Sequence, residues 1–370
     1  MKKRLLSTML ALVLSISLLS GCSTNNGASK SDGASTNNGA SKDNTQSNSG
    51  SDEKKTYRIA VLLSGYRGDG AYNDYVYAGV QQAEEKLPVE VKFIESNEAA
   101  DWENNLIAMA TEDYDLVMGA SNQYQDIIQK QAPNFPKVNF ALVDGFVDLE
   151  NVVSVTFSFP DGGFLAGAAA AIIANSPDIP GITGSKTVGF VAGMEIPIMQ
   201  QFYAGYEAGV HYIDPSMKVL SAYAGTFNDP LKGKELAYAQ FDQGADVIVQ
   251  SAAGTGNGIM EVALEKGKYV IGLDVFEQGP YLDTMATNVY RHIDEAVFNI
   301  IESVVQEKYE GGLQMVNEAA SGMVSLYAWD NFKRIIGDKF PAELETKIDE
   351  LEQMFMDGKI VIEDGVVVVK

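Results

Sequence analysis

Polar and aromatic side chains follow the apolar, β-rich runs of this chain at the points where those runs end. A glycine-rich segment after the first run carries Asp69, Tyr72 and Asn73, while Asp144 and Asp274 come directly after two later runs. Amide and carboxylate groups form hydrogen bonds to small molecules, and an aromatic ring stacks on a flat heterocycle for roughly 1–3 kcal/mol per ring. One such cluster at each run end is hard to explain as core packing. The pattern therefore indicates a site that binds a small ligand.

The residue types give little support to chemistry beyond binding. The two histidines, His211 and His292, lie far apart in the sequence, and no G-x-S-x-G motif is present. Gly254 and Gly256 belong to a glycine-rich run, but Ile259 stands where the dinucleotide-binding motif G-x-G-x-x-G needs its third glycine. We therefore expect no catalytic residue, no metal ion and no cofactor.

The elements that must position these run ends alternate regularly along the chain. Short β-rich runs alternate with helical patterns, which predicts parallel sheets covered by helices. The pattern restarts near residue 186, after a break rich in Pro, Gly and Ser at Asn175–Ser185. We therefore expect an α/β fold of two doubly wound, Rossmann-like lobes, with the ligand in a cleft at the carboxyl ends of their strands.

The expected elements can be given by their ranges. The strands are Tyr57–Leu63, Val89–Ile94, Asp115–Gly119, Val138–Val143, Thr187–Val191, Lys218–Tyr223, Ala245–Gln250 and Tyr269–Leu273. The helices are Tyr72–Leu87, Trp102–Thr111, Gln123–Gln131, Phe164–Asn175, Pro197–Tyr212, Pro230–Asp242, Gly258–Lys266 and a further helix near residues 292–309.

The start of the chain predicts export and lipid attachment. Basic residues at positions 2–4 precede an apolar run over residues 5–19 that is too short to span a bilayer comfortably, and Leu19-Ser20-Gly21-Cys22 then forms a lipobox. We expect residues 1–21 to be a cleaved signal peptide and Cys22, the only cysteine, to carry lipid. The alternative is an uncleaved anchor beside a free buried cysteine. A single cysteine excludes intramolecular disulfides in either case.

The segment over residues 22–55 predicts a tether. After Cys22 it consists almost entirely of Ser, Asn, Gly, Thr, Asp and Lys, so it cannot bury enough apolar surface to offset its ordering entropy. Lipid on Cys22 would hold the body of the protein at the outer face of the cell membrane while the tether lets it move. We therefore expect an extracytoplasmic location and a role in transport or surface sensing.

Composition limits the partners of the body. Residues 56–370 suit two domains, and no segment among them is long and apolar enough to span a bilayer. The formal charge is −23 and becomes −26 without the three basic residues of the signal peptide. Such an acidic surface disfavours nucleic acid and anionic lipid as partners, although solubility alone explains it as well. We expect a monomer.

The run-end motifs resemble those of one known family. Gly68-Asp69-Gly70-Ala71-Tyr72-Asn73 is similar to the D-x-S-F-N turn of the basic membrane lipoprotein family, which includes purine-nucleoside-binding lipoproteins of bacterial ABC importers. The likeness covers about residues 57–300 and implies the type I periplasmic-binding architecture. Further matching segments, in family order, are Gly189–Met194 with Pro197, Phe202–Tyr206, Phe227–Ala237, Gly244–Ile248 and Ile271–Asp274.

The resemblance implies a role for each candidate residue. In the family, a purine base lies between aromatic rings of the two lobes, and a carboxylate and a lysine hold the ribose hydroxyls. The corresponding positions are Tyr72 for the first ring, Asn73 and Asp144 for the base edge, Phe227 or alternatively Phe202 for the second ring, Asp274 for the ribose carboxylate, and Gly254 or Gly256 for close backbone approach, with Asp69 in the first turn. Two positions depart from the family. Tyr72 replaces the usual Phe, and Arg291 stands where the family has lysine.

The chemistry of these positions suits a nucleoside. Asn73 donates and accepts whereas an ionised Asp144 only accepts, so together they favour a base edge with N–H groups, such as that of guanine or hypoxanthine. Asp274 can accept from both hydroxyls of a cis-diol, while Arg291 donates to the same oxygens and balances the carboxylate. Taken singly, Tyr72 and Phe227 would more often be packing residues, and Asp274 has an alternative as a helix cap.

These observations predict a lipid-anchored substrate-binding protein that passes a purine nucleoside to an ABC permease and is not an enzyme. One alternative is a surface receptor of the same fold for another ribose-containing or sugar-like ligand. A nucleoside hydrolase would need clustered aspartates to hold a metal, and Asp69, Asp74 and Asp144 lack that spacing. We expect one lobe to hold residues 56–160 plus about 288–320, and the other residues 161–287 plus about 321–370.

Overall fold

The computed structural model describes residues 55–96, 98–275, 281–363 and 366–370. The predicted signal peptide, the predicted lipid site at Cys22 and nearly all of the predicted tether lie outside these residues. Among the helices that are described, none combines the length and the apolar character needed to cross a membrane.

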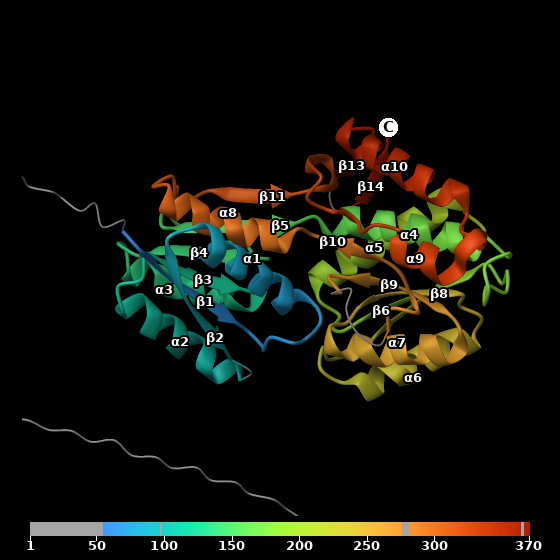
Figure 1. Ribbon diagram of the computed structural model, residues 1–370, viewed down its shortest axis with the longest axis horizontal. Helices are drawn as coiled ribbons and strands as arrows, with labels where there is room; N and C mark the ends of the chain where they lie inside the picture. The colour runs from blue at the N-terminus through green and yellow to red at the C-terminus, as the bar shows by residue number, and fades with distance from the viewer. Residues whose placement is uncertain (1–54, 97, 276–280, 364–365) are drawn as a thin grey trace, which may run out of the picture. The chain divides into compact units, whose positions relative to one another are not determined.

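The first sheet contains six described strands, all parallel, in the order β11-β5-β4-β3-β1-β2 (Figure 1). The central strands are buried on both faces, as their continuous apolar sequences predict for a parallel sheet covered by helices. The strands are β1 Tyr57–Leu63, β2 Val89–Glu95, β3 Leu116–Ala120, β4 Asn139–Val143, β5 Val152–Phe157 and β11 Gln314–Asn317.

Helices cover both faces of this sheet and complete the first lobe. Along β1, Ile59 and Val61 pack toward α1 and α8, whereas Leu62 packs toward α2 and α3 on the opposite face. Helices α1 and α8 approach closely because position 79 is glycine, where a Cβ would come 2.5 Å from the carbonyl oxygen of Asp294. The elements are α1 Tyr72–Lys86, α2 Ala99–Thr111, η1 Asn122–Tyr124, α3 Gln125–Gln131, η2 Ala132–Asn134 and α8 Ile293–Val305.

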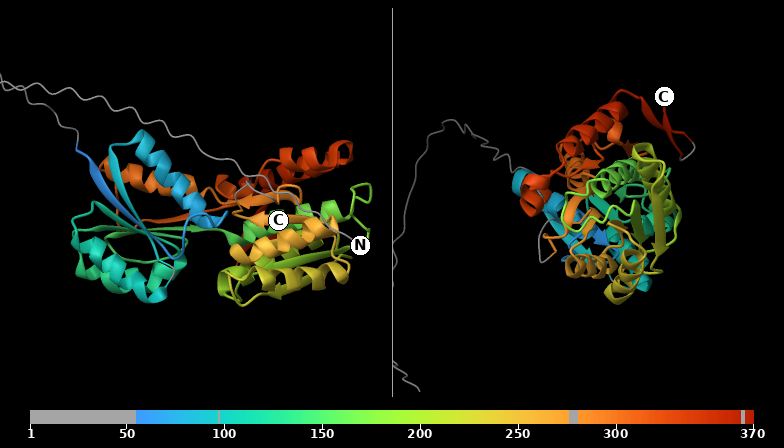
Figure 2. Two further views of the ribbon diagram at one scale, coloured as in Figure 1. Left: turned by 60° about the horizontal axis from the view of Figure 1, so that its bottom comes forward. Right: turned by 90° about the vertical axis from the view of Figure 1, so that its right-hand side faces the viewer.

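The second sheet also contains six described strands, in the order β12-β10-β9-β8-β6-β7. All neighbours pair in parallel except the short edge strand β12, which runs antiparallel to β10. Figures 1 and 2 show α6 and α7 side by side on one face of this sheet. The elements are β6 Thr187–Ala192, β7 Lys218–Tyr223, α6 Pro230–Asp242, β8 Val247–Ser251, α7 Gly254–Lys266, β9 Tyr269–Leu273, β10 Met285–Tyr290 and β12 Ser325–Leu326.

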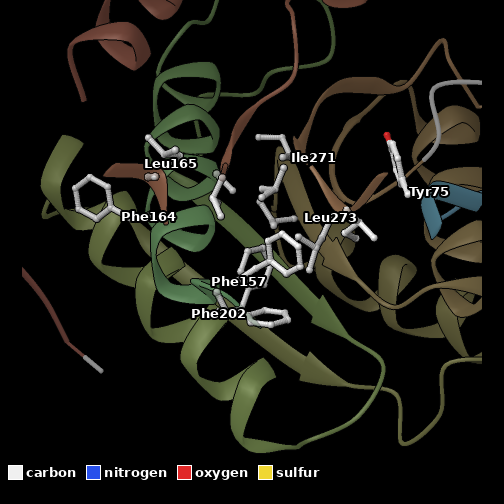
Figure 3. Packing of buried hydrophobic residues seen from close by; sticks show 14 of the residues in the cluster. Tyr75, Phe157, Phe164, Leu165, Phe202, Ile271 and Leu273 are labelled. Carbon is white, nitrogen blue, oxygen red and sulfur yellow. The ribbon is translucent and has the colours of Figure 1, made fainter. Parts of the chain in front are cut away.

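Helices α4 (Phe159–Ala174) and α5 (Pro197–Ile213) pack backbone to backbone on the other face of the second sheet. A Cβ at Gly167 would come 2.1 Å from the carbonyl oxygen of Tyr206, and one at Gly209 would come 2.0 Å from that of Phe164. Glycine is therefore required on both helices. Figure 3 shows the core beneath them, with Phe202 and Leu273 among its buried side chains.

The C-terminal part of the chain adds to the second lobe. Helix α10 packs against α4, and β13 and β14 form an antiparallel hairpin after it. The elements are η3 Ala319–Ser321, α9 Asp330–Ile336, η4 Gly337–Lys339, α10 Ala342–Met356, β13 Ile360–Glu363 and β14 Val366–Val369.

Three segments of the described chain connect the two sheets. The first runs from β5 to α4, the second from β10 to α8, and the third from β11 to β12. The first and third are bonded to each other, since the amide of Ser158 donates to the carbonyl oxygen of Asn317 over 2.8 Å. These crossovers are the only covalent links between the lobes among the described residues.

The predicted fold of two α/β lobes with parallel sheets is confirmed, and β1, β7, β9 and α6 have the predicted bounds. Three helices begin earlier than predicted, and α2 begins at Ala99 rather than residue 102. Helix α4 begins at Phe159 rather than residue 164, with Ser158 as its N-cap and Pro160 in its first turn. Helix α7 begins at Gly254 rather than residue 258, so the glycine-rich run after β8 is helical rather than a loop.

Candidate ligand-binding site

Four residues just after strands of the two sheets adopt left-handed backbone conformations. The φ angles are 69° at Asp144 after β4, 46° at Ala253 after β8, 50° at Asp274 after β9 and 42° at His292 after β10. Residues other than glycine rarely adopt such φ angles, and residues with a strained backbone cluster at functional sites. The carboxyl ends of these strands therefore form the candidate ligand site.

Arg291, which directly follows β10, joins two of these strand ends. Its Nη1 donates to Asp144 Oδ1 over 2.9 Å, and its Nε donates to Asp274 Oδ2 over 2.8 Å. Nη2 donates to the same Asp274 oxygen. Arg291 is 3% exposed and Asp274 is 4% exposed, so the guanidinium and that carboxylate are shielded from water. The structure thus brings together three of the residues that the sequence predicted for the site.

Burial and the facing charges together determine the pKa values of Asp274 and Arg291. Burial raises the pKa of Asp274, and the facing guanidinium of Arg291 only partly offsets that rise. Burial acts to lower the pKa of Arg291, but the carboxylates of Asp144 and Asp274 outweigh it and raise that pKa above its ordinary value. Arg291 is therefore a permanent cation held by two carboxylates.

One oxygen of this cluster has no partner. Asp274 Oδ1 is buried and has no hydrogen-bond partner among the described residues, although the backbone amide of Arg291 lies near this carboxyl and acts to lower its pKa. Asn288 Nδ2, on the adjacent strand β10, is likewise buried and unpaired within the described chain, while Asn288 Oδ1 accepts from the amide of Val275 over 3.0 Å. Buried polar groups are nearly always paired. An unpaired acceptor and an unpaired donor therefore lie close to one strand end, and a polar ligand that reached them would satisfy both.

Aromatic rings surround the guanidinium. The Cζ atom of Arg291 lies 5.8 Å from the ring centroid of Tyr72, 5.3 Å from that of Phe157 and 4.5 Å from that of Phe159. Cation–π contacts of this kind stabilise a desolvated cation. Burial raises the pKa of the Tyr72 hydroxyl well above its usual value, and the nearby Asp144 adds to the effect. Tyr72 is therefore a neutral, partly buried aromatic residue at the start of α1.

Asp69 shapes the glycine-rich turn before α1. Its carboxylate accepts from the amides of Ala71 and Asn73 and from Asn73 Nδ2 over 2.9 Å. Gly68 and Gly70 both have positive φ, which favours glycine at these positions. The bonds to Asp69 orient the Asn73 amide and occupy one of its two N–H groups, so they give Asp69 a positioning role within the loop.

The two alternatives for the second ring lie in different places. The ring of Phe227, in the loop between β7 and α6, covers Gly193 and is partly exposed. Phe202 on α5 is 0% exposed and packs against the rings of Phe159 and Phe190 in the core (Figure 3). Because no ligand could reach that ring without opening the core, we leave Phe202 out of the proposed contacts.

The two glycines of α7 also differ. A Cβ at Gly254 would come 3.3 Å from the carbonyl oxygen of Phe227, so this residue lies beside the Phe227 loop. A Cβ at Gly256 would come 2.3 Å from the side-chain oxygen of Gln250, so that glycine makes room for a protein side chain. The close approach at Gly256 is therefore within the protein.

Sequence reasoning missed Phe157, Phe159, Gly193 and Asn288. The two phenylalanines flank a crossover that only the topology reveals. Asn288 is a polar residue in the run Met285–Tyr290, and that position could have marked it as a site residue. The same polar residue, however, kept the run from being recognised as a strand.

The comparison with protein families agrees with the geometry. The model of the Bmp family, described as ABC transporter substrate-binding protein PnrA-like, matches residues 56–356. The chain belongs to this family. The resemblance drawn from the motifs is thereby confirmed, and the Bmp family description is that of a substrate-binding component.

Relatives and solved structures extend the comparison. The chain is 26% identical to the "ABC transporter nucleoside-binding protein BmpA" of Lactococcus lactis, over 98% of this chain and 99% of that protein. It is 27% identical to "Basic membrane protein A" of Borreliella burgdorferi, over 85% and 90%. A solute-binding protein of an Aeropyrum pernix ABC transporter superposes with a TM-score of 0.73 at 26% identity, over 83% of this chain and 93% of that one. The corresponding protein of Conexibacter woesei, with a TM-score of 0.69 at 21% identity over 84% and 99%, shows the fold alone.

Proposed function

We propose that this Bmp-family protein binds a purine nucleoside between its lobes and delivers it to an ABC permease. The observation that carries the proposal is the free Oδ1 of Asp274, a buried acceptor at the carboxyl end of β9. Support for a nucleoside comes from the name of the Lactococcus lactis relative. The purine base and the individual contacts are part of the proposal.

The base lies between Tyr72 of the first lobe and Phe227 of the second. Both rings are partly buried rather than locked in the core, so each keeps some exposed surface. Asn73 and Asp144 hold the base edge. Asp69 takes one N–H of Asn73, which leaves the amide oxygen and a second N–H to meet the base.

The ribose hydroxyls donate to Asp274. Its Oδ2 is occupied by Arg291, whereas Oδ1 has no described partner and can accept from a diol. Asn288 Nδ2 supplies a donor from the neighbouring strand. A ligand that satisfies both atoms removes the cost of leaving buried polar groups unpaired.

The occupancy of Arg291 argues against an acidic ligand. An arginine that recognises a ligand carboxylate presents a free fork to it. Here Nε and Nη2 bind Asp274 and Nη1 binds Asp144. The two carboxylates and one guanidinium carry a net negative charge, which favours a neutral ligand rich in N–H and O–H groups.

We further propose that residues 1–21 direct export, that lipid on Cys22 anchors the protein at the extracytoplasmic face of the cell membrane, and that the protein performs no reaction. A permease would then recognise the closed, ligand-bound form. Incubation with inosine tests the last point, because release of free hypoxanthine would show a hydrolase instead.

Isothermal titration with a panel of ligands tests the proposal. We expect adenosine, guanosine or inosine to bind more tightly than their free bases and much more tightly than ribose. Phe227→Ala should weaken nucleoside binding by about tenfold or more, because one stacked ring contributes roughly 1–3 kcal/mol. Tyr66→Ala, at an exposed aromatic residue of the first lobe, is the matched control and should leave the affinity unchanged. A wild-type protein that binds no purine nucleoside would overturn the ligand assignment.

A further inference from the structure

Arg291 lies on the crossover between the lobes. It follows β10 of the second sheet and precedes α8, which packs on α1 of the first lobe. Its guanidinium bonds to Asp144 at the end of β4 in the first sheet and to Asp274 at the end of β9 in the second. One side chain thus connects carboxylates of both lobes.

The guanidinium also packs on a second crossover. Phe157 ends β5 and Phe159 begins α4, and both rings lie within 5.3 Å of Arg291 Cζ. The backbone of this crossover is in turn bonded to the third one through the amide of Ser158 and the carbonyl of Asn317. The Arg291 side chain therefore lies on one of the three crossovers and packs against another.

This connection needs the shape of arginine. A planar guanidinium points its Nε and Nη2 edge at one carboxylate while Nη1 points at another. A lysine ammonium is a compact point charge on a thinner stem, and it cannot fill the space between two phenylalanine rings in the same way. Breaking either ion pair would leave a charge without its partner in a site with 3% exposure of Arg291, so the pairs oppose separation of the lobes.

We propose that Arg291 is a positioning residue that ties the two lobes together in the absence of ligand, through the chain Asp144–Arg291–Asp274. The tie sets how often the ligand-free cleft opens, and so it sets the fraction of protein that is ready to admit a ligand. The apparent rate of ligand association is proportional to that fraction, so a smaller open fraction makes association slower. The proposal rests on the proposed function only for the choice of inosine as probe.

Small-angle X-ray scattering of the full chain without ligand tests the tie. We expect Arg291→Lys to raise the radius of gyration above that of the wild type, and saturating inosine to remove the difference. Stopped-flow measurement should show inosine associating with Arg291→Lys about three- to tenfold faster than with the wild type, since more of the variant is open. Asp144→Asn weakens the same link from the other lobe and should shift the ligand-free scattering in the same direction.

Lys268→Gln is the matched control. Lys268 Nζ bonds to the buried carboxylate of Asp246 over 2.6 Å, and both residues belong to the second lobe. This change also breaks a shielded ion pair, but it should lower the melting temperature without changing the ligand-free radius or the association rate.

Unchanged scattering and unchanged association in Arg291→Lys would overturn the proposal and leave Arg291 as a local structural residue. An equal expansion in Lys268→Gln would overturn it too, because the effect would then reflect general loosening. If Arg291→Lys does not fold, Asp144→Asn decides by the ligand-free scattering alone, because Asp144 is also a proposed contact to the base. Failure of the wild type to bind inosine would refute the proposed ligand, yet the scattering without ligand would still test the tie.

Discussion

The ring of Phe227 lies directly over the backbone of Gly193, where a Cβ atom would come 2.2 Å from ring atom Cδ1. The two residues are 34 positions apart and follow the neighbouring strands β6 and β7. Glycine at 193 therefore determines where this ring lies, and any larger residue must displace it.

Gly193→Ala is expected to weaken inosine binding by about tenfold, because the displaced ring no longer stacks on the base. In the Phe227→Ala background the same change should have almost no further effect, since there is no ring left to move. Isothermal titration of the four proteins completes the cycle. Additive losses would mean that Gly193 acts independently of Phe227.

Asp274→Asn should weaken nucleoside binding by about ten- to a hundredfold, because charge-assisted hydrogen bonds contribute roughly 1.5–3 kcal/mol. A free base lacks the ribose and should lose little affinity. Titration of guanosine and guanine, or of another nucleoside and base pair that binds, makes the comparison. Equal losses for both ligands would place Asp274 away from the ribose.

Arg291→Ala should destabilise the protein by about 3–5 kcal/mol, because it leaves Asp274 buried without its cation. Arg291→Lys keeps a positive charge there, so nucleoside affinity should stay within about tenfold of the wild type, a change of about 1.4 kcal/mol or less. Urea unfolding and titration measure the two effects. An alanine variant as stable as the wild type would show that the ion pairs contribute nothing net.

Asp161→Asn should make the protein more stable at pH 7.5 and equally stable near pH 3. Burial raises the pKa of Asp161, and its Oδ1 has no described partner, although Oδ2 accepts from the amide of Ala319. A raised pKa means that the folded state binds the proton more tightly, so this group's contribution is greatest below its ordinary pKa and is lost as pH rises through the folded value. Unfolding curves of both proteins across this pH range give the test, and a wild type that gains stability relative to the variant with rising pH would contradict it.

Cys22→Ala should release the protein into the medium or leave it with an uncleaved signal, since lipid is its proposed membrane attachment. Cell fractionation and intact mass determine which occurs. Membrane retention with a cleaved signal would refute the lipid anchor.

The fold was predictable because hydrophobic pattern and turn residues act locally. Apolar runs such as Lys218–Tyr223, and Pro230 at the start of a helix, carry their own signals. The C-terminal strands were not predicted, because β11 and β12 are short edge strands that form only against partners far away in sequence.

The site, like the fold, has features that local sequence predicts and features that only the assembled structure reveals. Asp144, Asp274 and Arg291 were identified from their places after strands or in a family motif. Their mutual ion pairs depend on how two sheets meet, which no local pattern encodes. The choice between Phe202 and Phe227 likewise needed the packing of α5, since both are aromatic residues in family motifs.

Because the chain crosses between the two lobes three times, the order of its synthesis determines when each lobe can fold. The face of the first sheet that α1 shares with α8 stays only partly covered until Ile293–Val305 has emerged, and its edge strand comes later still, at Gln314–Asn317. A growing chain that ends at Ala174 already contains five of the six strands of that sheet but cannot bury it. The first lobe in sequence must therefore wait, and a chaperone or export factor can engage its exposed strands while residues 175–317 are being made.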